Sequence, residues 1–219
     1  MDETTIPWSR AAAFVRQHTH DVRNGLNSLD LEMEYLSELV PAEGEAADSV
    51  KRVRRQVRAV TQQLRTLSTL FQEPSAVAAK LPARVLLKIW REKHAALTAA
   101  PEVRWTDELG EEQVSVDVEM MATVFRELLT NATLHSPGAP LMISARCEGN
   151  EVTFELREPK KAAVDPSAWG QPFSSTRRDH YGLGLWNARR LMQASGVSFR
   201  QSYLADEACL LTRLALPVV

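Results

Sequence analysis

Two long apolar seams dominate the first third of the chain. Apolar residues recur at alternating steps of four and three over 15–40 and again over 50–71, with one polar interruption in the first seam. This heptad pattern predicts two amphipathic helices with continuous apolar faces. Gly44 and Asp48, the expected N-cap of the second helix, lie between the seams, and Pro74 follows them. The segment is therefore predicted to be a helical hairpin.

The length of these seams bears on the oligomeric state. Two helices with apolar faces this long cannot bury them against each other alone, and a second copy would complete a four-helix bundle. We therefore predict a homodimer. Packing of the hairpin against the C-terminal part of its own chain is the alternative.

Composition excludes several classes of protein. A formal net charge of −2 and a pI near 6.2 give no reason to expect nucleic acid or an anionic membrane as a partner. Apolar runs such as 11–15 fall far short of the about 20 residues that span a bilayer, and the acidic N-terminus is unlike a signal peptide. The two cysteines form no Cys-x-x-Cys motif, so neither a disulfide framework nor a zinc site is indicated. We expect a cytoplasmic chain without a membrane span.

From about Leu81 the pattern changes to mixed helix and strand. Alternating runs predict strands and 3.6-residue periodicity predicts helices, and a long loop over 159–181 has the character of a functional lid. The predicted helices are 82–97, 117–135 and one beginning near 182, and the predicted strands are 102–105, 113–116, 141–147, 152–156, 197–203 and 209–216. The predicted fold class is α+β, with a helical hairpin over 1–73 followed by an α/β sandwich over 74–219.

A first chemical candidate lies on the first helix. The seam places His20 off the buried face, so packing does not explain it. A neutral imidazole is a good nucleophile toward phosphorus, and an adjacent carboxylate can hold its other ring N–H. Asp21 is placed for that role, and Asn24 lies one turn later on the same face. An uninvolved histidine on a solvated face is the alternative.

A second candidate lies in the helix predicted over 117–135. Glu127 and Asn131 are one turn apart on the flank of its apolar stripe, where they would border a cleft when the stripe packs on a sheet. A carboxylate and an amide oxygen suit Mg²⁺, which keeps several waters while it bridges phosphates. These two residues are the predicted metal ligands, and an ordinary solvated flank is the alternative.

A third candidate is the start of the helix after the long loop. Gly182 and Gly184 flank Leu183 at this point. Glycines at a helix N-terminus let backbone N–H groups approach an anion, and the helix dipole favours phosphate. A tight loop-to-helix turn packed on the sheet is the alternative.

Together these motifs resemble the two-component sensor histidine kinases, which join a dimerisation and phosphotransfer hairpin to a Bergerat-type ATPase domain. His20, Asp21 and Asn24 resemble the phosphoacceptor box, with Gly25 where proline is usual. The runs 125–132, 172–177 and 182–185 resemble the N box, the F box and the second glycine box, in the order that the family has them. The resemblance implies catalytic roles for His20, Asp21, Asn24 and Glu127, nucleotide contacts from Asn131, Glu158, Phe173, Thr176, Gly182, Leu183 and Gly184, and Mg²⁺ on Asn131 and Glu127.

The first glycine box departs from the family. After the strand at 152–156 the family has Asp-x-Gly-x-Gly, whose Asp accepts a hydrogen bond from the adenine amino group. This chain has Glu-Pro-Lys-Lys-Ala over 158–162, with a carboxylate one methylene longer and no glycine. Leu134 also stands where the N box commonly carries a lysine. A misplaced acceptor in a buried base pocket costs about 1–3 kcal/mol, or roughly 10- to 150-fold in affinity.

The resemblance implies an ATP-dependent protein-histidine kinase. It would phosphorylate His20 and pass the phosphoryl group to an Asp of a response regulator receiver domain, with the signal arriving from a separate sensor protein or from a further part of the natural chain. Two alternatives stay open. One is a histidine phosphotransfer or scaffold protein whose degenerate ATPase domain does not bind nucleotide, and the other is a serine kinase of the anti-sigma type, for which the histidine box would be superfluous.

Overall fold

The computed structural model describes residues 7–97, 100–135, 138–166, 171–172 and 182–219. The chain forms two compact units, Met1–Glu73 and Pro74–Val219. A helical region is followed by a mixed α/β sheet domain, which confirms the predicted fold class. No helix among the described residues is both long enough and apolar enough to cross a membrane.

The first unit is a hairpin of two helices, α1 (Trp8–Leu39) and α2 (Glu45–Leu70). Gly44 precedes α2 with a φ of 113°, a backbone conformation that side chains other than glycine rarely adopt. Because α2 already begins at Glu45, Asp48 lies inside its first turn, and the predicted N-cap is wrong. The backbone freedom of Gly44, rather than an Asp cap, marks the start of this helix.

Contacts at several points along the hairpin join the two helices. Trp8 stacks on Phe71 with ring centroids 5.2 Å apart, so the beginning of α1 is tied to the end of α2. Further along, Asp30 accepts hydrogen bonds from Arg54 and Arg58 at 3.1 and 3.2 Å. The polar interruption of the first seam, Thr19, is buried, and its hydroxyl donates to a backbone carbonyl of its own helix. A threonine is therefore tolerated inside an apolar seam.

The seams are only partly covered within one chain. Five seam residues remain on the surface, and Leu29, for example, keeps 48% of its area exposed. They recur at heptad spacing on each helix: Val22, Leu29 and Leu36 on α1, and Val53 and Val60 on α2. One side of each seam thus packs inside the hairpin, and the other side forms an apolar stripe, here called the exposed seam.

The described residues of the second unit form two sheets, three α-helices and a short 3-10 helix. Its elements are β1 (Ala79–Pro82), α3 (Ala83–Ala95), β2 (Val103–Glu108), β3 (Gln113–Val116), α4 (Val118–His135), β4 (Leu141–Glu148), β5 (Glu151–Pro159), α5 (Gly184–Ala194), β6 (Ser198–Leu204), a short 3-10 helix (Ala205–Glu207) and β7 (Cys209–Pro217). The strand β1 pairs with β3, and the larger sheet has the order β2-β4-β5-β7-β6, antiparallel except for β2 and β4. Strand β1 was not predicted, and the predicted ends of β2 and β5, at residues 105 and 156, each fall three residues short.

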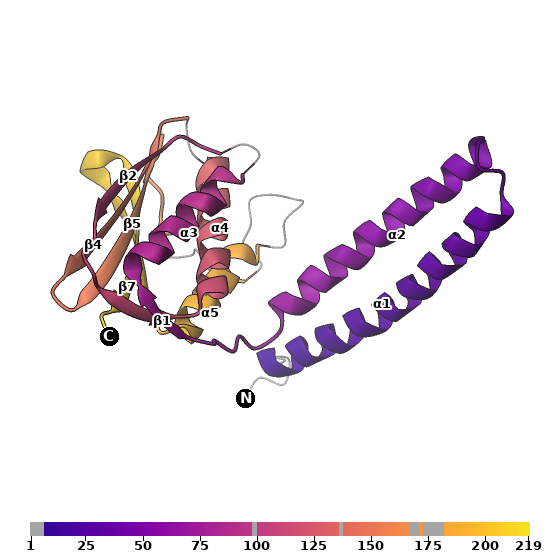
Figure 1. Ribbon diagram of the computed structural model, residues 1–219, viewed down its shortest axis with the longest axis horizontal. Coiled ribbons are helices and arrows are strands. Elements are labelled where there is room, and N and C mark those ends of the chain that lie inside the picture. The colour runs from indigo at the N-terminus through magenta and orange to yellow at the C-terminus, as the bar shows by residue number, and fades with distance from the viewer. Residues whose placement is uncertain (1–6, 98–99, 136–137, 167–170, 173–181) are drawn as a thin grey trace. The chain divides into compact units, whose positions relative to one another are not determined.

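The helices α3, α4 and α5 cover one face of the larger sheet (Figure 1). Between these two layers lies a closed apolar core whose centre is aromatic. The ring of Trp90 from α3 stacks on Phe125 of α4 at 4.4 Å and contacts Phe154 of β5 at 4.7 Å. This core fixes α4 and β5 relative to each other, and both elements carry candidate site residues.

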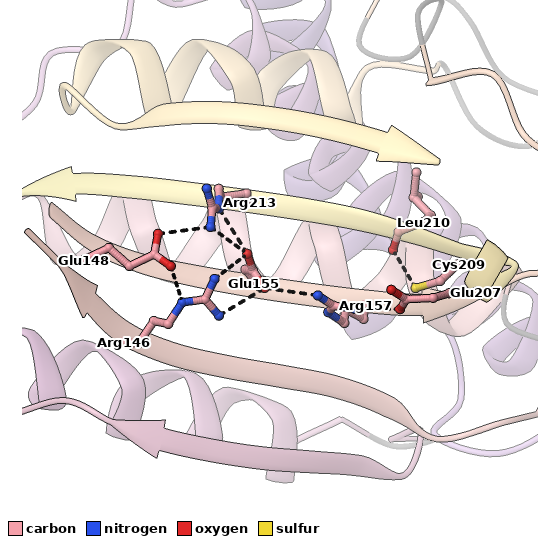
Figure 2. Close-up of polar contacts among 8 residues, drawn as sticks. All are labelled: Arg146, Glu148, Glu155, Arg157, Glu207, Cys209, Leu210 and Arg213. Atoms are coloured by element: carbon pink, nitrogen blue, oxygen red, sulfur yellow. Dashed lines mark hydrogen bonds and ion pairs between the residues drawn. The ribbon is translucent and has the colours of Figure 1, made fainter. Parts of the chain in front are cut away.

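A network of charged side chains lies on the opposite face of the sheet (Figure 2). Glu155 at its centre is 3% exposed, and its carboxylate accepts hydrogen bonds from Arg146 at 3.1 Å and Arg213 at 3.0 Å. Arg157 lies 3.7 Å from the same carboxylate, and Glu148 bridges the other two arginines. Since charges are buried only when they are paired, the surrounding arginines make the burial of Glu155 acceptable.

Candidate functional site

His20 lies on the surface of α1 with 55% of its side chain exposed. Its Nδ1 atom is 3.3 Å from Asp21 Oδ1 and 3.4 Å from Asn24 Nδ2. Gln17, one turn earlier, donates to the same Asp21 oxygen at 2.9 Å. The structure thus brings together the three residues of the predicted phosphoacceptor box and adds Gln17, which the sequence analysis missed. Its only signal was its position four residues before Asp21.

The contact with Asp21 bears on the tautomer of His20. The hydrogen bond from Gln17, followed by that from His20, lowers the pKa of Asp21 below its ordinary value. An ionised carboxylate only accepts hydrogen bonds, so this contact favours a ring proton on Nδ1, whereas the amide nitrogen of Asn24 approaches the same atom as a donor. In the tautomer that Asp21 favours, a neutral ring has its lone pair on Nε2.

The second group of predicted residues meets where α4 passes the start of α5. A Cβ atom added at Gly184 would lie only 2.7 Å from Glu127 Oε2, so this carboxylate rests against the glycine backbone. Gly182 has a φ of 63°, and Leu183 is buried at the N-cap of α5. Asn131 is half-buried one turn after Glu127. The predicted Mg²⁺ ligands and the glycine box therefore share one locality.

Asp117 sets the position of α4. Its carboxylate accepts the backbone N–H groups of Met120 at 2.9 Å and Val77 at 2.8 Å, which caps the helix and ties it to the segment before β1. Burial raises the pKa of Asp117, but these N–H groups together with that of Glu119 outweigh it and leave the pKa below its ordinary value. The cap therefore helps to hold Glu127 and Asn131 in place.

Glu158 lies at the end of β5, on the side that faces the helices. It follows the core residues Phe154 and Leu156 at steps of two, and side chains two apart in a strand share a face. Its carboxylate is already engaged, because Lys160 Nζ donates to Glu158 Oε2 at 2.8 Å and both side chains are buried. Burial raises the pKa of Glu158, and the lysine opposes that shift. The sequence analysis placed Lys160 in a loop and missed this pair.

Two further polar residues, Thr212 of β7 and Gln201 of β6, lie on the same face of the sheet as Glu158. Thr212 is the cross-strand neighbour of Leu156, and its hydroxyl accepts a hydrogen bond from Gln201 Nε2 at 3.0 Å. The Oε1 atom of Gln201 is buried and has no hydrogen-bond partner among the described residues. Neither residue was predicted, because they come from separate strands and meet only through sheet pairing.

The predicted residues fit the phosphate end of a magnesium nucleotide better than its base end. At the start of α5 the carboxylate of Glu127 lies against the backbone of Gly184, and Asn131 follows one turn later on α4, so this region offers two oxygen-bearing side chains of the kind that suit Mg²⁺. At the other end, a lysine holds the carboxylate of Glu158. In the part of the chain that the structure describes, no three His, Cys, Asp or Glu side chains cluster closely enough to hold a metal by themselves. Phe173 and Thr176, predicted to contact nucleotide, lie outside the described residues.

No protein-family model and no curated protein matches the sequence. Solved structures do resemble it. Full-length ShkA in complex with AMPPNP matches over 94% of this chain with a TM-score of 0.70 and 15% identity. The Acinetobacter baumannii histidine kinase AdeS matches over 92% of this chain and 96% of its own, with a TM-score of 0.55 and 14% identity. The mycobacterial sensor histidine kinase MprB matches over 65% of this chain and 98% of its own, with a TM-score of 0.54 and 17% identity.

The chain has the fold of a histidine kinase catalytic core. It spans only 46% of the length of ShkA. The resemblance to solved histidine kinases covers both units, because the matches to ShkA and AdeS extend over more than nine tenths of the chain.

Proposed function

We propose that the chain is a protein-histidine kinase that phosphorylates His20 from ATP. The observation that carries this proposal is the contact between His20 Nδ1 and Asp21 on an exposed helix of a chain with the histidine kinase fold. An exposed imidazole beside a carboxylate has no packing role, whereas a phosphoacceptor needs both accessibility and a free lone pair.

Each site residue has a distinct part in this reaction. Asp21 holds the Nδ1 proton of His20 while Nε2 forms a bond to the γ-phosphorus, and the bond from that phosphorus to the bridging oxygen breaks to release ADP. ATP with Mg²⁺ supplies the activated phosphoryl group. Glu127 and Asn131 would hold the metal ion, and the backbone N–H groups from Gly182 to Gly184 would neutralise phosphate charge; the contact of Glu127 with the Gly184 backbone supports this assignment. Asn24, one turn from His20, is placed to orient groups at the phosphorylated imidazole.

The partners follow from the same proposal. The phosphoryl group passes from His20 to an Asp of a response regulator receiver domain, and a separate sensor protein or a further part of the natural chain provides the signal. The exposed seam supports a homodimer, since a second hairpin would cover its heptad-spaced apolar residues. Both cysteines are free thiols, which suits the reducing cytoplasm.

One observation favours a second candidate. The buried Lys160 occupies the carboxylate that would receive the adenine amino group, so a phosphotransfer protein that does not bind ATP is also supported. In that case His20 would exchange phosphoryl groups with receiver domains only. The His20 hairpin serves both candidates, and they differ in the source of the phosphoryl group.

Radiolabelled ATP separates the two candidates. The full chain is incubated with γ-labelled ATP and Mg²⁺ beside the variant His20→Gln and the matched control His18→Gln, which removes another exposed histidine of the same helix. A kinase acquires acid-labile label in the wild type and the control but not in His20→Gln. A wild type that stays unlabelled and binds no nucleotide by calorimetry refutes the kinase.

Phosphoramidate tests His20 without any nucleotide. It transfers its phosphoryl group as its P–N bond breaks and ammonia leaves, so labelling depends on the nucleophile alone. We expect His20-dependent modification under both candidates. If phosphoramidate modifies wild type and His20→Gln equally, His20 is not the phosphoacceptor and both candidates fail.

The metal role can be tested on α4. Asn131→Asp should abolish labelling by ATP, because a second carboxylate one turn from Glu127 alters the metal site without removing core packing. The exposed neighbour Thr130→Asp is the matched control for added charge. Unchanged labelling in Asn131→Asp would contradict a role in holding Mg²⁺.

A further inference from the structure

Lys160 is a buried lysine in a position that strand pairing holds firmly. Lysine is seldom buried unless it is paired, yet its side chain here is 5% exposed while Lys161 beside it faces solvent. Its backbone N–H donates to the carbonyl of Ala208 at 2.8 Å, which continues the pairing of β5 and β7 by one residue. The backbone is therefore fixed, and the side chain reaches back along the helix-facing side of the sheet to Glu158.

The pair changes what Glu158 can recognise. A free carboxylate accepts hydrogen bonds from an amino group and repels a carbonyl oxygen, which distinguishes adenine from a base with a keto group at the same position. Here Oε2 accepts a charge-assisted hydrogen bond from Lys160, and such bonds are stronger than those from neutral N–H groups. An adenine amino group would have to displace an ammonium group by offering a weaker donor.

We propose that Lys160 removes discrimination at the purine 6-position, so that the domain takes purine nucleotides with a 6-amino or a 6-keto group alike. This inference rests on the proposed function to the extent that the α/β unit is taken as nucleotide-binding. Recognition is then carried by the phosphate and sugar, beside Glu127 and the glycine backbone of α5, and the base contributes little.

ADP and IDP are the appropriate probes, because IDP carries a keto group where ADP carries the amino group. Calorimetry with Mg²⁺ measures both dissociation constants for the full-length wild type, for Lys160→Met and for the matched control Lys161→Met. Methionine keeps most of the unbranched side chain and removes the ammonium group. We expect the wild type and the control to bind ADP and IDP within about threefold of each other. Lys160→Met should prefer ADP by about tenfold or more, the worth of one hydrogen bond to a charged group.

A second variant checks folding and isolates the carboxylate, since Lys160→Met leaves a buried carboxylate without its partner. Glu158→Gln combined with Lys160→Met buries no charge, and its amide can accept a hydrogen bond from an amino group or donate one to a keto group. We expect it to bind ADP and IDP within about threefold of each other, and its circular dichroism and melting should match those of the wild type.

Three results would overturn the inference: a wild type that already prefers ADP by tenfold or more, a Lys160→Met variant that keeps the wild-type ratio, or no binding of either nucleotide by the wild type and both variants. The outcome is separable from that of the kinase proposal. A chain that gains ADP preference on losing Lys160 but shows no His20-dependent label refutes the kinase and keeps the inference. A chain that is labelled on His20 but whose preference between ADP and IDP does not depend on Lys160 supports the kinase and refutes the inference.

Discussion

The two units differ in how completely they bury their apolar residues. The α/β unit encloses its aromatic centre, and Trp90, Phe125 and Phe154 are each at most 2% exposed. The hairpin leaves the exposed seam on its surface, with Leu29 and Val60 among the residues at 48% and 43% exposure. Burial of apolar area is the main source of stability, so the α/β unit can stand alone in a way that the hairpin cannot.

The two units also differ in where they keep their reactive groups. His20 is exposed and contacts residues of its own helix, which suits the proposed reaction, in which it would meet a nucleotide and then a receiver domain. Glu127 and Glu158 are held in place by tertiary contacts with Gly184 and Lys160. A residue that must meet two partners suits an open helix, whereas groups that must hold a ligand still suit a packed core.

The largest expected effect comes from charging the exposed seam. Leu29→Glu combined with Val60→Glu would bury four carboxylates in a dimer, at a total cost of more than about 5 kcal/mol, but would leave them in water in a monomer. We expect multi-angle light scattering to show a wild-type dimer and a monomeric variant with unchanged circular dichroism. Asn27→Glu, which is exposed outside the seam, is the matched control.

This test can fail in two ways. A wild type that is monomeric at all concentrations would show that the exposed seam is not covered by a second copy. A double variant that remains dimeric would show that the dimer uses another surface.

The next largest effect concerns the charge network on the open face of the sheet. Glu155→Gln leaves Arg146, Arg157 and Arg213 around a neutral side chain, and breaking a buried pair costs 3–5 kcal/mol when it is fully buried. The three arginines keep part of their side chains exposed, so we expect a loss of about 2–3 kcal/mol in urea unfolding. Glu151→Gln, at the exposed start of β5, should change stability little. Equal effects of the two substitutions would show that the network is solvated.

Much of the fold could be predicted because its signals are local. The hairpin and α4 follow from periodicity within single segments, which does not depend on distant parts of the chain. The short strand β1 could not be found in this way, since its four residues are ordered by pairing with β3, more than thirty positions later. The end of β5 was misplaced because Pro159 signals a break, yet the strand continues to pair there with Cys209.

The candidate site likewise contains residues with local sequence signals and residues that meet only through tertiary structure. The residues His20, Asp21 and Asn24 could be predicted because one helix places all three. The locality shared by Glu127 and Gly184 was expected only through the order of the motifs. The pairing of Lys160 with Glu158 could not be predicted, since it depends on the strand extending far enough for both side chains to face the helices. Polar pairs that require a sheet are not visible in a single run of sequence.

A smaller effect is expected at the start of α4. Asp117→Ala removes the acceptor of two backbone N–H groups, and loss of such a cap costs about 1–2 kcal/mol. Because the pKa of Asp117 is lowered by folding, its contribution is present above the ordinary value of 3.8 and is lost as the pH falls through the lower, folded value. The difference between wild type and variant should therefore be full at pH 6 and disappear in strong acid. Thermal melts across this range test it, with Glu111→Ala as control.

The smallest expected effect compares one glycine from each unit. Gly25 lies inside α1 with no atom near the position that a Cβ would take, so Gly25→Ala should stabilise the chain by about 0.5–1 kcal/mol. Gly149 has equal space but a φ of 62°, so Gly149→Ala should destabilise it by a similar or larger amount. The space around Gly25 is that of a single hairpin. If Gly25→Ala lowers the melting temperature of the dimer while leaving a monomeric seam variant more stable, a second helix must approach α1 closely at this residue.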